Sequence, residues 1–331
     1  MIKEKMKEIR KIGILTSGGD APGMNAAIRA VVRTAVYNRV ETVGIMRGFC
    51  GLIEKTMIPM PSHSVSKIIA LGGTILKSSR CPEFKDPVVR KQAYHNLCEA
   101  GIDALVVLGG DGSFQGANIF HRETGFPVIG IPCTIDNDIF GSDFTIGFDT
   151  AINTAMQAID KIRDTADSHN ILFFVEVMGR DVGFIGLSTS IAVGAEAVLL
   201  PEVKSDIQGL CDYIDYERRK NKTSGIIIVS EGNSAGSAHK VAEQVSKILP
   251  NYEMRVTTLG HIQRGGAPTC SDRVLSSMLG HGAVTALLRG ISNVMVGQIN
   301  GAITYTPLEE AISKHSEINQ SWYNILKILS S

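Results

Sequence analysis

The chain has 331 residues, which is enough for two domains or for one large α/β unit. Its 33 Lys and Arg residues balance its 33 Asp and Glu residues, so its charge gives no reason to expect nucleic-acid or membrane partners. The six cysteines show neither CxxC pairs nor zinc-ligand spacing, and we interpret them as reduced thiols of a cytoplasmic protein. No apolar run approaches the roughly 18 residues of a membrane span, and the charged start has no apolar core like that of a signal peptide.

Short apolar runs alternate with helix-like stretches along the chain. The expected strands are residues 11–16, 42–46, 104–108, 128–132, 172–177, 197–200, 226–230, 255–259 and 293–298, and the expected helices include 26–37, 86–100, 150–165 and 238–249. Strands that are apolar on both faces and alternate with helices indicate an α/β chain with mainly parallel sheets. Ligands of such sheets bind at the carboxyl ends of the strands.

The first strand is followed by the loop TSGGDAPGMN, residues 16–25. Successive glycines expose backbone N–H groups, and the following helix adds its positive end, so the loop favours a phosphate. The structural alternative is a tight strand–helix turn with Asn25 as the helix N-cap. The loop is neither a Walker P-loop nor a GxGxxG dinucleotide motif.

A second loop, GGDGS at residues 109–113, follows the strand at 104–108. A GGDG loop also occurs in NAD kinases and diacylglycerol kinases, so it indicates nucleotide phosphates without naming the acceptor. The structural alternative is a turn. Asp111 among glycines suits a magnesium ion that bridges phosphate oxygens.

The third loop, PCTIDND at residues 132–138, places two carboxylates after an apolar strand. One carboxylate of such a pair can take a proton while the other faces a metal ion. The structural alternative is that Asp136 and Asp138 are turn or helix-capping residues. The functional interpretation is favoured because Thr134 and Asn137 add hydrogen-bonding groups around them.

Taken together, five motifs resemble those of the bacterial ATP-dependent 6-phosphofructokinases. They are TSGGDAPGMN, GGDGS, TIDND, Met178-Gly179-Arg180 and the GHIQRGG segment at 260–266, and their order and spacing agree from about residue 11 to about 289. NAD and diacylglycerol kinases lack the TIDND and HIQRGG segments. The resemblance implies two Rossmann-like three-layer α/β/α domains with mainly parallel sheets and an active-site cleft between them. It implies a larger, nucleotide-binding domain (residues 1–146 plus 262–311), a smaller, sugar-phosphate-binding domain (147–261 plus 312–331) and a homotetramer.

The same resemblance implies Mg²⁺-dependent transfer of the ATP γ-phosphoryl group to the 1-hydroxyl of fructose 6-phosphate. The catalytic residues would be Asp136 as the base, Thr134, Arg80 and Arg180, with Mg²⁺ near Asp111 and Asp138. The ATP-binding residues would be Gly19, Arg80, Cys81, Gly109, Gly110, Asp111, Gly112 and Ser113. The substrate-binding residues would be Thr134, Ile135, Asp136, Met178, Gly179, Arg180, Glu231, Arg255, His261, Ile262, Gln263 and Arg264, with Arg255 reaching over from a neighbouring subunit.

Two positions favour ATP over pyrophosphate as the phosphoryl donor. Pyrophosphate-using relatives carry Asp where this chain has Gly112, and Lys where it has Cys133. Cys133 replaces the usual glycine of the ATP-using family but brings no positive charge. Cys81 stands where the family often has an aromatic residue near adenine, so we expect weaker stacking on the base.

The sugar-phosphate site departs from the family at Ile171, where an arginine usually reaches across the subunit interface. Losing one charge-assisted hydrogen bond to phosphate costs about 1.5–3 kcal/mol. We therefore expect a high KM for fructose 6-phosphate or another preferred sugar phosphate. The alternatives are a kinase of another sugar phosphate, a pyrophosphate-using variant, or a non-catalytic regulatory subunit.

A third group of residues matches the family's site for an ADP or phosphoenolpyruvate effector. These residues are Arg29, Arg33, Arg163, Gly194, Glu196, Lys220 and Lys222. Ser62 and Lys67 stand where an arginine and an aspartate are usual. A basic cluster split between subunits still suits an anionic effector.

Overall fold

The computed structural model describes residues 8–220 and 224–329. The chain divides into two compact units: unit 1 comprises Met1–Asp149 and Arg264–Ser316, and unit 2 comprises Thr150–Gln263 and Glu317–Ser331. The resemblance implied boundaries after residues 146, 261 and 311, and the roles it gives the two units remain predictions. No helix in the described part of the chain has the length and apolar character needed to cross a membrane.

Unit 1 is built on an eight-stranded sheet in the order β12-β11-β5-β4-β1-β2-β3, with β6 paired to β5. Its strands are β1 (Lys11–Thr16), β2 (Glu41–Ile45), β3 (Met57–Pro59), β4 (Ala104–Gly109), β5 (Val128–Thr134), β6 (Ile146–Gly147), β11 (Val294–Ile299) and β12 (Ala302–Pro307). Only the outer pairs β2–β3 and β11–β12 are antiparallel among the described strand pairs. The predicted class of mainly parallel α/β sheets is confirmed.

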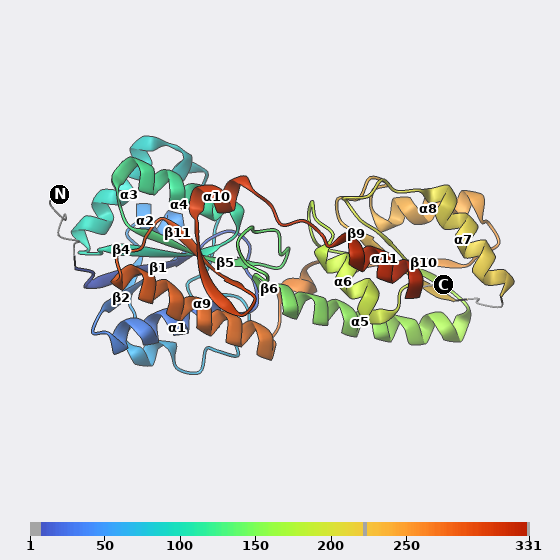
Figure 1. The fold of residues 1–331 in the computed structure, drawn as a ribbon, viewed down its shortest axis with the longest axis horizontal. Helices are drawn as coiled ribbons and strands as arrows, with labels where there is room; N and C mark the ends of the chain where they lie inside the picture. Colours follow the sequence, from blue (N-terminus) through green and yellow to red (C-terminus); the bar gives the residue numbers. More distant parts are fainter. Residues whose placement is uncertain (1–7, 221–223, 330–331) are drawn as a thin grey trace. The chain divides into compact units, whose positions relative to one another are not determined.

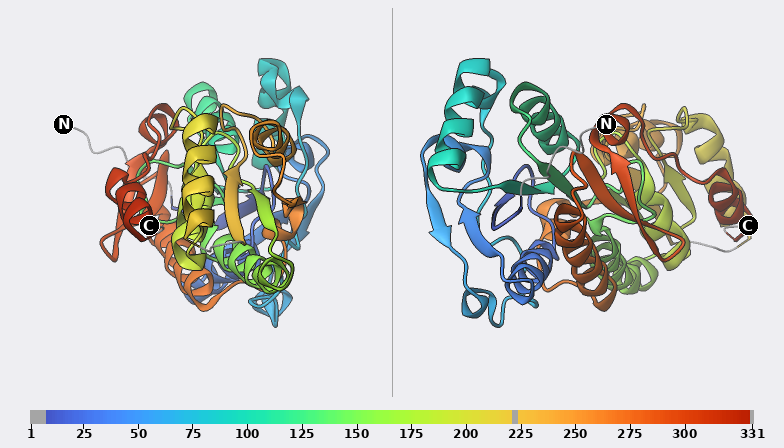
Figure 2. Two further views of the ribbon diagram at one scale, coloured as in Figure 1. Left: turned by 90° about the vertical axis from the view of Figure 1, so that its right-hand side faces the viewer. Right: turned by 60° about the vertical axis from the view of Figure 1, so that its left-hand side comes forward.

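Helices cover both faces of this sheet. They are α1 (Met24–Tyr37), α2 (Phe49–Ile53), α3 (Pro87–Glu99), α4 (Asp111–Thr124), α9 (Cys270–Leu288) and α10 (Leu308–Ser313), with the short 3₁₀ turns η1 (Ser62–Val65) and η2 (Pro82–Lys85). One core joins α2, α3, α4 and α10 to the strands, while α1 and α9 lie side by side on the other face (Figures 1 and 2). Burial on both faces explains why β4 is a continuous apolar run.

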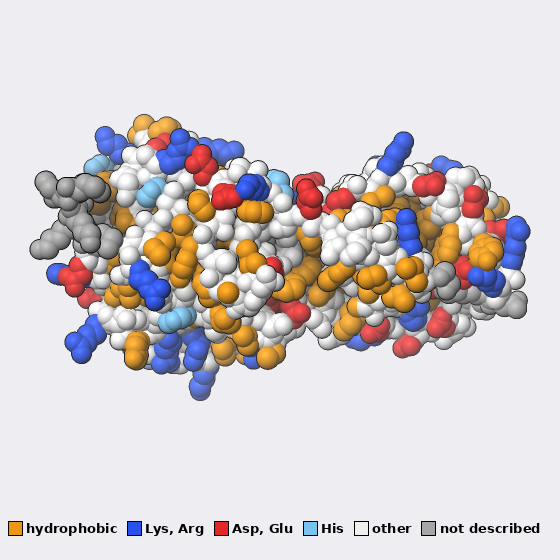
Figure 3. Space-filling view, viewed as in Figure 1, with side chains coloured by type: hydrophobic (Ala, Val, Ile, Leu, Met, Phe, Trp, Pro, Cys, Tyr) orange, Lys and Arg blue, Asp and Glu red, His pale blue; other side chains and the backbone are white. Residues whose placement is uncertain are grey.

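Unit 2 has a four-stranded, wholly parallel sheet in the order β10-β7-β9-β8. Its elements are α5 (Phe148–His169), β7 (Leu172–Val177), α6 (Phe184–Val193), β8 (Ala197–Leu199), α7 (Ile207–Arg219), β9 (Gly225–Ser230), α8 (Ala238–Ile248), β10 (Met254–Thr258), η3 (Gly260–Arg264) and α11 (Gln320–Leu329); α5 begins in unit 1, and η3 ends there. Helices α7 and α8 pack on one face around Phe174, and α6 covers the other with α11 against it (Figure 1). Acidic and basic side chains are scattered over the face of each unit shown in Figure 3.

Each sheet has a point where the direction of strand addition reverses. In unit 1 the chain adds β2 and β3 on one side of β1 and then returns to form β4 on the other side. In unit 2, β9 and β8 lie on one side of β7 and β10 lies on the other. The crevice beyond the carboxyl ends of strands at such a point is where open α/β sheets bind ligands. The fold therefore places one candidate binding region in each unit.

Candidate functional site

The two glycine loops of unit 1 lie side by side at the carboxyl ends of β1 and β4. The Ser17 amide donates a hydrogen bond to the Leu108 carbonyl oxygen at 2.9 Å. A Cβ atom at Gly109 would lie 2.6 Å from the Ser17 carbonyl oxygen and 2.7 Å from the Ser113 Cβ, so only glycine fits. Gly18 has φ of +84°, which also favours glycine. The structure thus brings together the predicted ATP-binding residues of both loops.

The helices that follow these loops begin without a side-chain cap. Gly23 precedes α1 and Gly110 precedes α4, and a glycine at the N-cap has no side chain that could accept a hydrogen bond from the first turn. By contrast, the side chains of Asp86, Asp206, Ser237 and Thr269 cap α3, α7, α8 and α9. The N–H groups of the first turn of α1 and α4 are therefore suited to bind an anion such as phosphate.

Asn25 does not cap α1, so that structural alternative is wrong. The helix begins at Met24, and Asn25 lies inside its first turn with 1% of its surface exposed. Its Nδ2 donates to the carbonyl oxygens of Leu71 (3.2 Å) and Gly72 (3.1 Å), and its Oδ1 accepts from the Ile75 amide at 2.8 Å. Asn25 therefore fixes the segment that leads towards Arg80.

Asp111 has one carboxylate oxygen suited to a cation. Its Oδ2 accepts a hydrogen bond from Gln115 Nε2 at 2.7 Å, whereas its Oδ1 is buried and has no hydrogen-bond partner in the described structure. A buried carboxylate oxygen without a partner is costly unless a cation or another ligand satisfies it. Because Mg²⁺ prefers carboxylate oxygens, Asp111 fits the predicted metal role.

Gly112, the next residue, faces open space. A Cβ atom at this position would have no described atom within 4 Å. The loop therefore has room at the position where the pyrophosphate-using relatives carry an aspartate.

The loop after β5 is held by hydrogen bonds within itself. The Asp136 amide donates to Thr134 Oγ1 at 3.2 Å, and Thr145 Oγ1 donates to the Thr134 carbonyl oxygen at 2.7 Å. Asn137 has φ of +56°, and its Oδ1 accepts from the Thr145 amide at 2.8 Å. Asp136 is 5% exposed, and Asp138 is partly buried. The next described element is strand β6 rather than a helix, so the two aspartates do not cap a helix.

Cys133 lies in β5 and pairs with Ile146 of β6. It is 1% exposed, and burial, with a smaller effect of the Asp272 carboxylate, raises the pKa of the Cys133 thiol well above its usual value. The side chain is therefore a neutral thiol within the sheet. It brings no charge to the end of β5.

Arg80 and Cys81 precede η2. The Arg80 side chain is exposed, and its carbonyl oxygen accepts a hydrogen bond from Cys50 Sγ at 3.5 Å. Burial, and then a hydrogen bond with Cys50, raises the pKa of Cys81 to about 12, so Cys81 is a protonated thiol near neutral pH. Cys81 packs against the same core as Phe84.

In unit 2, the predicted sugar-phosphate residues Met178, Gly179, Arg180 and Glu231 gather at the carboxyl ends of β7 and β9. Gly179 and Arg180 have φ of +147° and +55°. The Arg180 amide donates to Glu231 Oε2 at 3.1 Å, and the Met178 amide donates to Gln263 Oε1 at 3.4 Å. These bonds hold a turn that non-glycine residues rarely adopt at Arg180.

The boundary between the two units falls within the HIQR segment, between Gln263 and Arg264. Gln263 is fully buried in unit 2, while His261 and Ile262 are exposed. Arg264 belongs to unit 1, where its Nη1 donates to the Asp20 carbonyl oxygen at 3.4 Å and lies against Gly19. Arg264, predicted for the sugar phosphate, thus contacts the first glycine loop.

The structure does not bring Arg255 to the Met178–Arg180 turn within this chain. Arg255 lies on edge strand β10, is exposed, and pairs with Glu253 at 2.6 Å. Ile171 is 6% exposed and precedes β7 at the same end of the sheet, where Phe173 is the register partner of Arg255.

Part of the predicted effector site comes together in unit 2. Arg163 Nη2 donates to the carbonyl oxygens of Val193 (2.7 Å) and Gly194 (3.3 Å). Its Nη1 lies 3.8 Å from Glu196 Oε1, and Glu196 also accepts from the Ile226 amide.

The other predicted effector residues belong to other elements or lie outside the described residues. Lys220 Nζ lies 3.2 Å from Glu217 Oε1 and 4.2 Å from the centre of the Tyr216 ring; hydrogen bonds, first with Tyr216 and then with Glu217, raise the pKa of Lys220. Arg29 and Arg33 belong to α1 in unit 1. Lys222 lies outside the described residues.

Comparison with known proteins identifies the family. A sequence profile described as Phosphofructokinase matches residues 11–287, which is most of the chain. The chain belongs to the phosphofructokinase family. This phosphofructokinase is 52% identical over 325 residues to ATP-dependent 6-phosphofructokinase 2 of Bacteroides thetaiotaomicron, covering 98% of the chain and 100% of that protein. It is 49% identical to ATP-dependent 6-phosphofructokinase 1 of Thermus thermophilus, covering 97% of the chain and 100% of that protein.

The fold also matches that of a solved phosphofructokinase. The crystal structure of Pichia pastoris phosphofructokinase in the T-state superposes with a TM-score of 0.87 at 33% identity, covering 98% of this chain. This chain spans 37% of the length of that yeast chain.

Sequence reasoning named Asn25 and Asn137 but missed that their side chains hold the loops of this phosphofructokinase in place. Asn25 and Asn137 both lie inside the quoted motifs, but their side-chain partners are backbone groups 46–50 and 6–8 residues away. Thr145 lies outside the motifs, and no sequence pattern indicated that it holds the loop.

Proposed function

We propose that this chain is an ATP-dependent 6-phosphofructokinase. It transfers the γ-phosphoryl group of ATP to the 1-hydroxyl of fructose 6-phosphate, giving fructose 1,6-bisphosphate and ADP, a step of glycolysis. The observation that carries the proposal is the match over 100% of the length of two relatives that bear this name. The geometry supports it with a buried carboxylate and glycine loops at the carboxyl ends of neighbouring strands.

Asp136 is the proposed base. Its carboxylate is 5% exposed and stands on a loop fixed by Thr134 and Thr145, which suits a group that must accept a proton from a positioned hydroxyl. As the phosphorus–oxygen bond to the sugar forms, the proton of the 1-hydroxyl passes to a carboxylate oxygen of Asp136, and ADP carries away the electrons of the broken bond.

The phosphates of ATP are proposed to bind at the two glycine loops and at the uncapped start of α4. Backbone N–H groups and the positive helix end favour the negative charge there. ATP is preferred to pyrophosphate because the space beside Gly112 can take the rest of the nucleotide, and because Cys133 is a buried neutral thiol rather than a lysine.

Asp111 and Asp138 are the residues that would hold Mg²⁺. When bound, the ion neutralises charge on the phosphate oxygens. The support from this chain is the buried Asp111 Oδ1, which has no hydrogen-bond partner in the described structure.

Arg80 and Arg180 are proposed to balance the charge on the transferring phosphoryl group. Both have exposed side chains and fixed backbones: Cys50 binds the Arg80 carbonyl oxygen, and Glu231 binds the Arg180 amide. Residues of both units therefore take part in the proposed reaction. The sugar phosphate would bind through the group around Met178 and Glu231, with His261 and Arg264.

We further propose a cytoplasmic homotetramer in which Arg255 serves a neighbouring subunit. ADP or phosphoenolpyruvate is the proposed effector. The support is the arrangement of Arg163 and Glu196 in unit 2 together with the basic residues of α1.

A donor and acceptor panel tests the proposed function. A coupled assay measures turnover with ATP or pyrophosphate against fructose 6-phosphate and other sugar phosphates, with and without ADP. Turnover that requires ATP, Mg²⁺ and fructose 6-phosphate is the expected result. A preference for pyrophosphate, or for another sugar phosphate, would replace the proposed activity. An absence of turnover with every pair would favour a non-catalytic subunit.

A further inference from the structure

Two cysteines far apart in the sequence meet beside a carboxylate in unit 1. The sulfur atoms of Cys50 and Cys81 and a carboxylate oxygen of Glu83 all lie within 4.8 Å of one another. Cys50 and Cys81 are partly buried, and Glu83 is exposed. The spacing of the cysteines in the sequence gave no indication of this cluster, because the fold joins α2 to η2.

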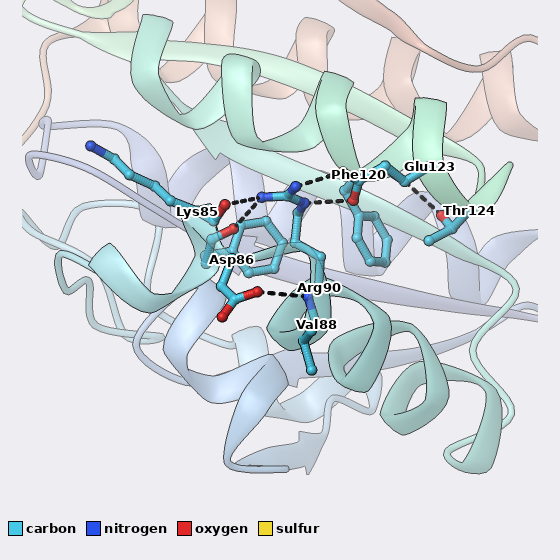
Figure 4. A network of polar contacts seen from close by, with 8 residues as sticks. Lys85, Asp86, Val88, Arg90, Phe120, Glu123 and Thr124 are labelled. Atoms are coloured by element: carbon cyan, nitrogen blue, oxygen red, sulfur yellow. Dashed lines mark hydrogen bonds and ion pairs between the residues drawn. The ribbon is translucent and has the colours of Figure 1, made fainter.

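The scaffold around these three side chains is fixed independently of any ligand. The Phe49 and Phe84 rings, next to the cluster on α2 and η2, stack with centroids 4.2 Å apart. Arg90 Nη1 donates to the carbonyl oxygens of Phe84 (2.8 Å) and Lys85 (2.7 Å), which holds the η2 turn in place (Figure 4). The cluster is therefore a consequence of core packing.

We propose that Cys50, Cys81 and Glu83 form a binding site for a thiophilic divalent cation of the Zn²⁺ class. Sulfur and carboxylate ligands in this ratio suit Zn²⁺, with a water molecule in the fourth position. Tetrahedral Zn²⁺ brings its ligand atoms to about 3.5–3.8 Å from one another, so side-chain shifts of about 1 Å suffice. Mg²⁺ prefers oxygen ligands, which separates this site from the proposed one at Asp111. On binding, both cysteines become thiolate ligands and release their protons to solvent.

Occupancy of this site would act on the nucleotide, a consequence that rests on the proposed function. Cys81 adjoins Arg80, and both are proposed to contact ATP. A cation bound to the Cys81 sulfur would keep that side chain from its proposed contact with ATP. Zn²⁺ is therefore expected to raise the KM for ATP and to leave the KM for fructose 6-phosphate unchanged.

Metal binding can be measured without any turnover. The untagged chain is stripped with a chelator, kept in excess Mg²⁺, and titrated with Zn²⁺ against a chromogenic chelator. A parallel titration with Co²⁺ detects the thiolate-to-metal charge-transfer band. We expect one tightly bound cation per chain and a clear thiolate band.

Variants show whether the three side chains are the ligands. Cys50→Ser and Cys81→Ser should each weaken Zn²⁺ binding at least about tenfold and diminish the Co²⁺ band, and Glu83→Gln should weaken binding about tenfold while keeping the band. Cys98→Ser and Cys270→Ser, at exposed cysteines, are the matched controls and should bind like the parent chain. Circular dichroism and the unfolding midpoint establish that each variant is folded.

The outcomes are separable. Equal Zn²⁺ affinity in the parent chain and in Cys81→Ser, or no thiolate band, overturns the site. A parent chain that does not bind Zn²⁺ and is lighter by two hydrogens, with a peptide linking the two cysteines, also overturns it in favour of a disulfide. Binding with an unchanged KM for ATP supports the site and refutes its effect on the nucleotide. Failure of turnover in the donor panel refutes the proposed function and leaves the binding result standing.

Discussion

Among individual residues, the carboxylates of the proposed site differ in how they are held. Asp136 is almost wholly buried. Its loop is held by internal hydrogen bonds that involve Thr134 and Thr145. Asp111 instead keeps one buried oxygen without a hydrogen-bond partner in the described structure. Burial and a fixed backbone suit a base, and an unsatisfied oxygen suits a metal ligand. The two roles proposed for these acids thus follow from different surroundings.

Replacing Asp136 should remove turnover without removing binding. Asp136→Ser cannot accept the proton of the sugar hydroxyl, so we expect kcat to fall by about 10²–10⁴-fold. The affinity for ATP, measured by titration without turnover, should change little. Asp212→Ser, at an exposed aspartate of α7, is the control and should keep the parental rate. Equal kcat in Asp136→Ser and the parent would refute the role of Asp136 as base.

Arg255 should matter for the sugar phosphate and not for the nucleotide. Ile171 is buried and apolar, and the resemblance implies an arginine at this position in the family, so we expect Arg255 to act without a second arginine. Losing a charge-assisted bond to phosphate costs about 1.5–3 kcal/mol, so Arg255→Ala should raise the KM for fructose 6-phosphate roughly tenfold to hundredfold. Arg219→Ala, at an exposed arginine paired with Asp215, is the control. A low parental KM that Arg255→Ala does not change would contradict this expectation.

At the level of helices and strands, an ion pair between buried Arg90 and partly exposed Glu123 ties α3 to α4. Arg90 is 6% exposed, and its Nε and Nη2 donate to the two carboxylate oxygens of Glu123 at 2.6 Å and 2.5 Å (Figure 4). The same guanidinium binds the η2 turn. One side chain therefore fixes three elements behind the segment of Arg80 and Cys81.

The Arg90–Glu123 pair should make stability depend on pH. Its hydrogen bond to Arg90 holds the pKa of Glu123 below the ordinary value of 4.5. This contribution is present above 4.5 and declines as the pH falls through the lowered folded-state value. At neutral pH, Glu123→Gln should lower the free energy of unfolding by about 1.5 kcal/mol, the low end for a charged bond because Glu123 is partly exposed.

Urea unfolding at neutral and acid pH measures this effect. Glu99→Gln is the matched control, because Glu99 pairs with Lys55 at the surface, where an ion pair contributes about 0.5 kcal/mol or less. The difference between the parent and Glu123→Gln should shrink at acid pH. A difference that persists unchanged below the folded-state pKa would show that packing, not charge, is responsible.

Much of the fold and of the site could be predicted at the level of elements. Glycine and aspartate loops directly after apolar strands indicated ligand-binding loops, because parallel strands bring their carboxyl ends to one edge. Arg264, by contrast, binds a carbonyl group 244 residues away, and Arg90 meets Glu123 across 33 residues. Neither pairing could be predicted from a local sequence pattern, because the partners are far apart in the chain. Asn25 was open to an N-cap interpretation because its partners in the 71–75 segment are 46–50 residues away.

For the whole molecule, the residues proposed for the reaction belong to two units, and the proposed homotetramer would add Arg255 from a neighbouring subunit. Asp136 lies in unit 1, and Arg180 and Arg255 lie in unit 2. If Arg255 serves a neighbouring subunit, a defect at Asp136 and a defect at Arg255 can occur in different chains and leave some sites intact.

Mixed oligomers test this arrangement. Asp136→Ser and Arg255→Ala chains, each impaired alone, are refolded or coexpressed together. Random mixing gives about a quarter of the sites both an intact Asp136 and an intact Arg255 from a neighbour, so activity at low fructose 6-phosphate should return to about a quarter of the parental value. The same preparation should sediment as a tetramer. Activity no higher than the sum of the separate variants would place both residues in one chain's site.

Two glycines of the second loop, Gly109 and Gly112, differ in the space around them. At Gly109 the backbone of the first loop and Ser113 occupy the space of any side chain, whereas at Gly112 that space is open. A side chain at Gly109 would therefore clash with these atoms and destabilise the folded loop. A side chain at Gly112 would not clash with the fold. Its effect would depend on the ligand that binds beside it. If Gly112 takes part in donor choice as proposed, an aspartate there could change the donor without disturbing the loop.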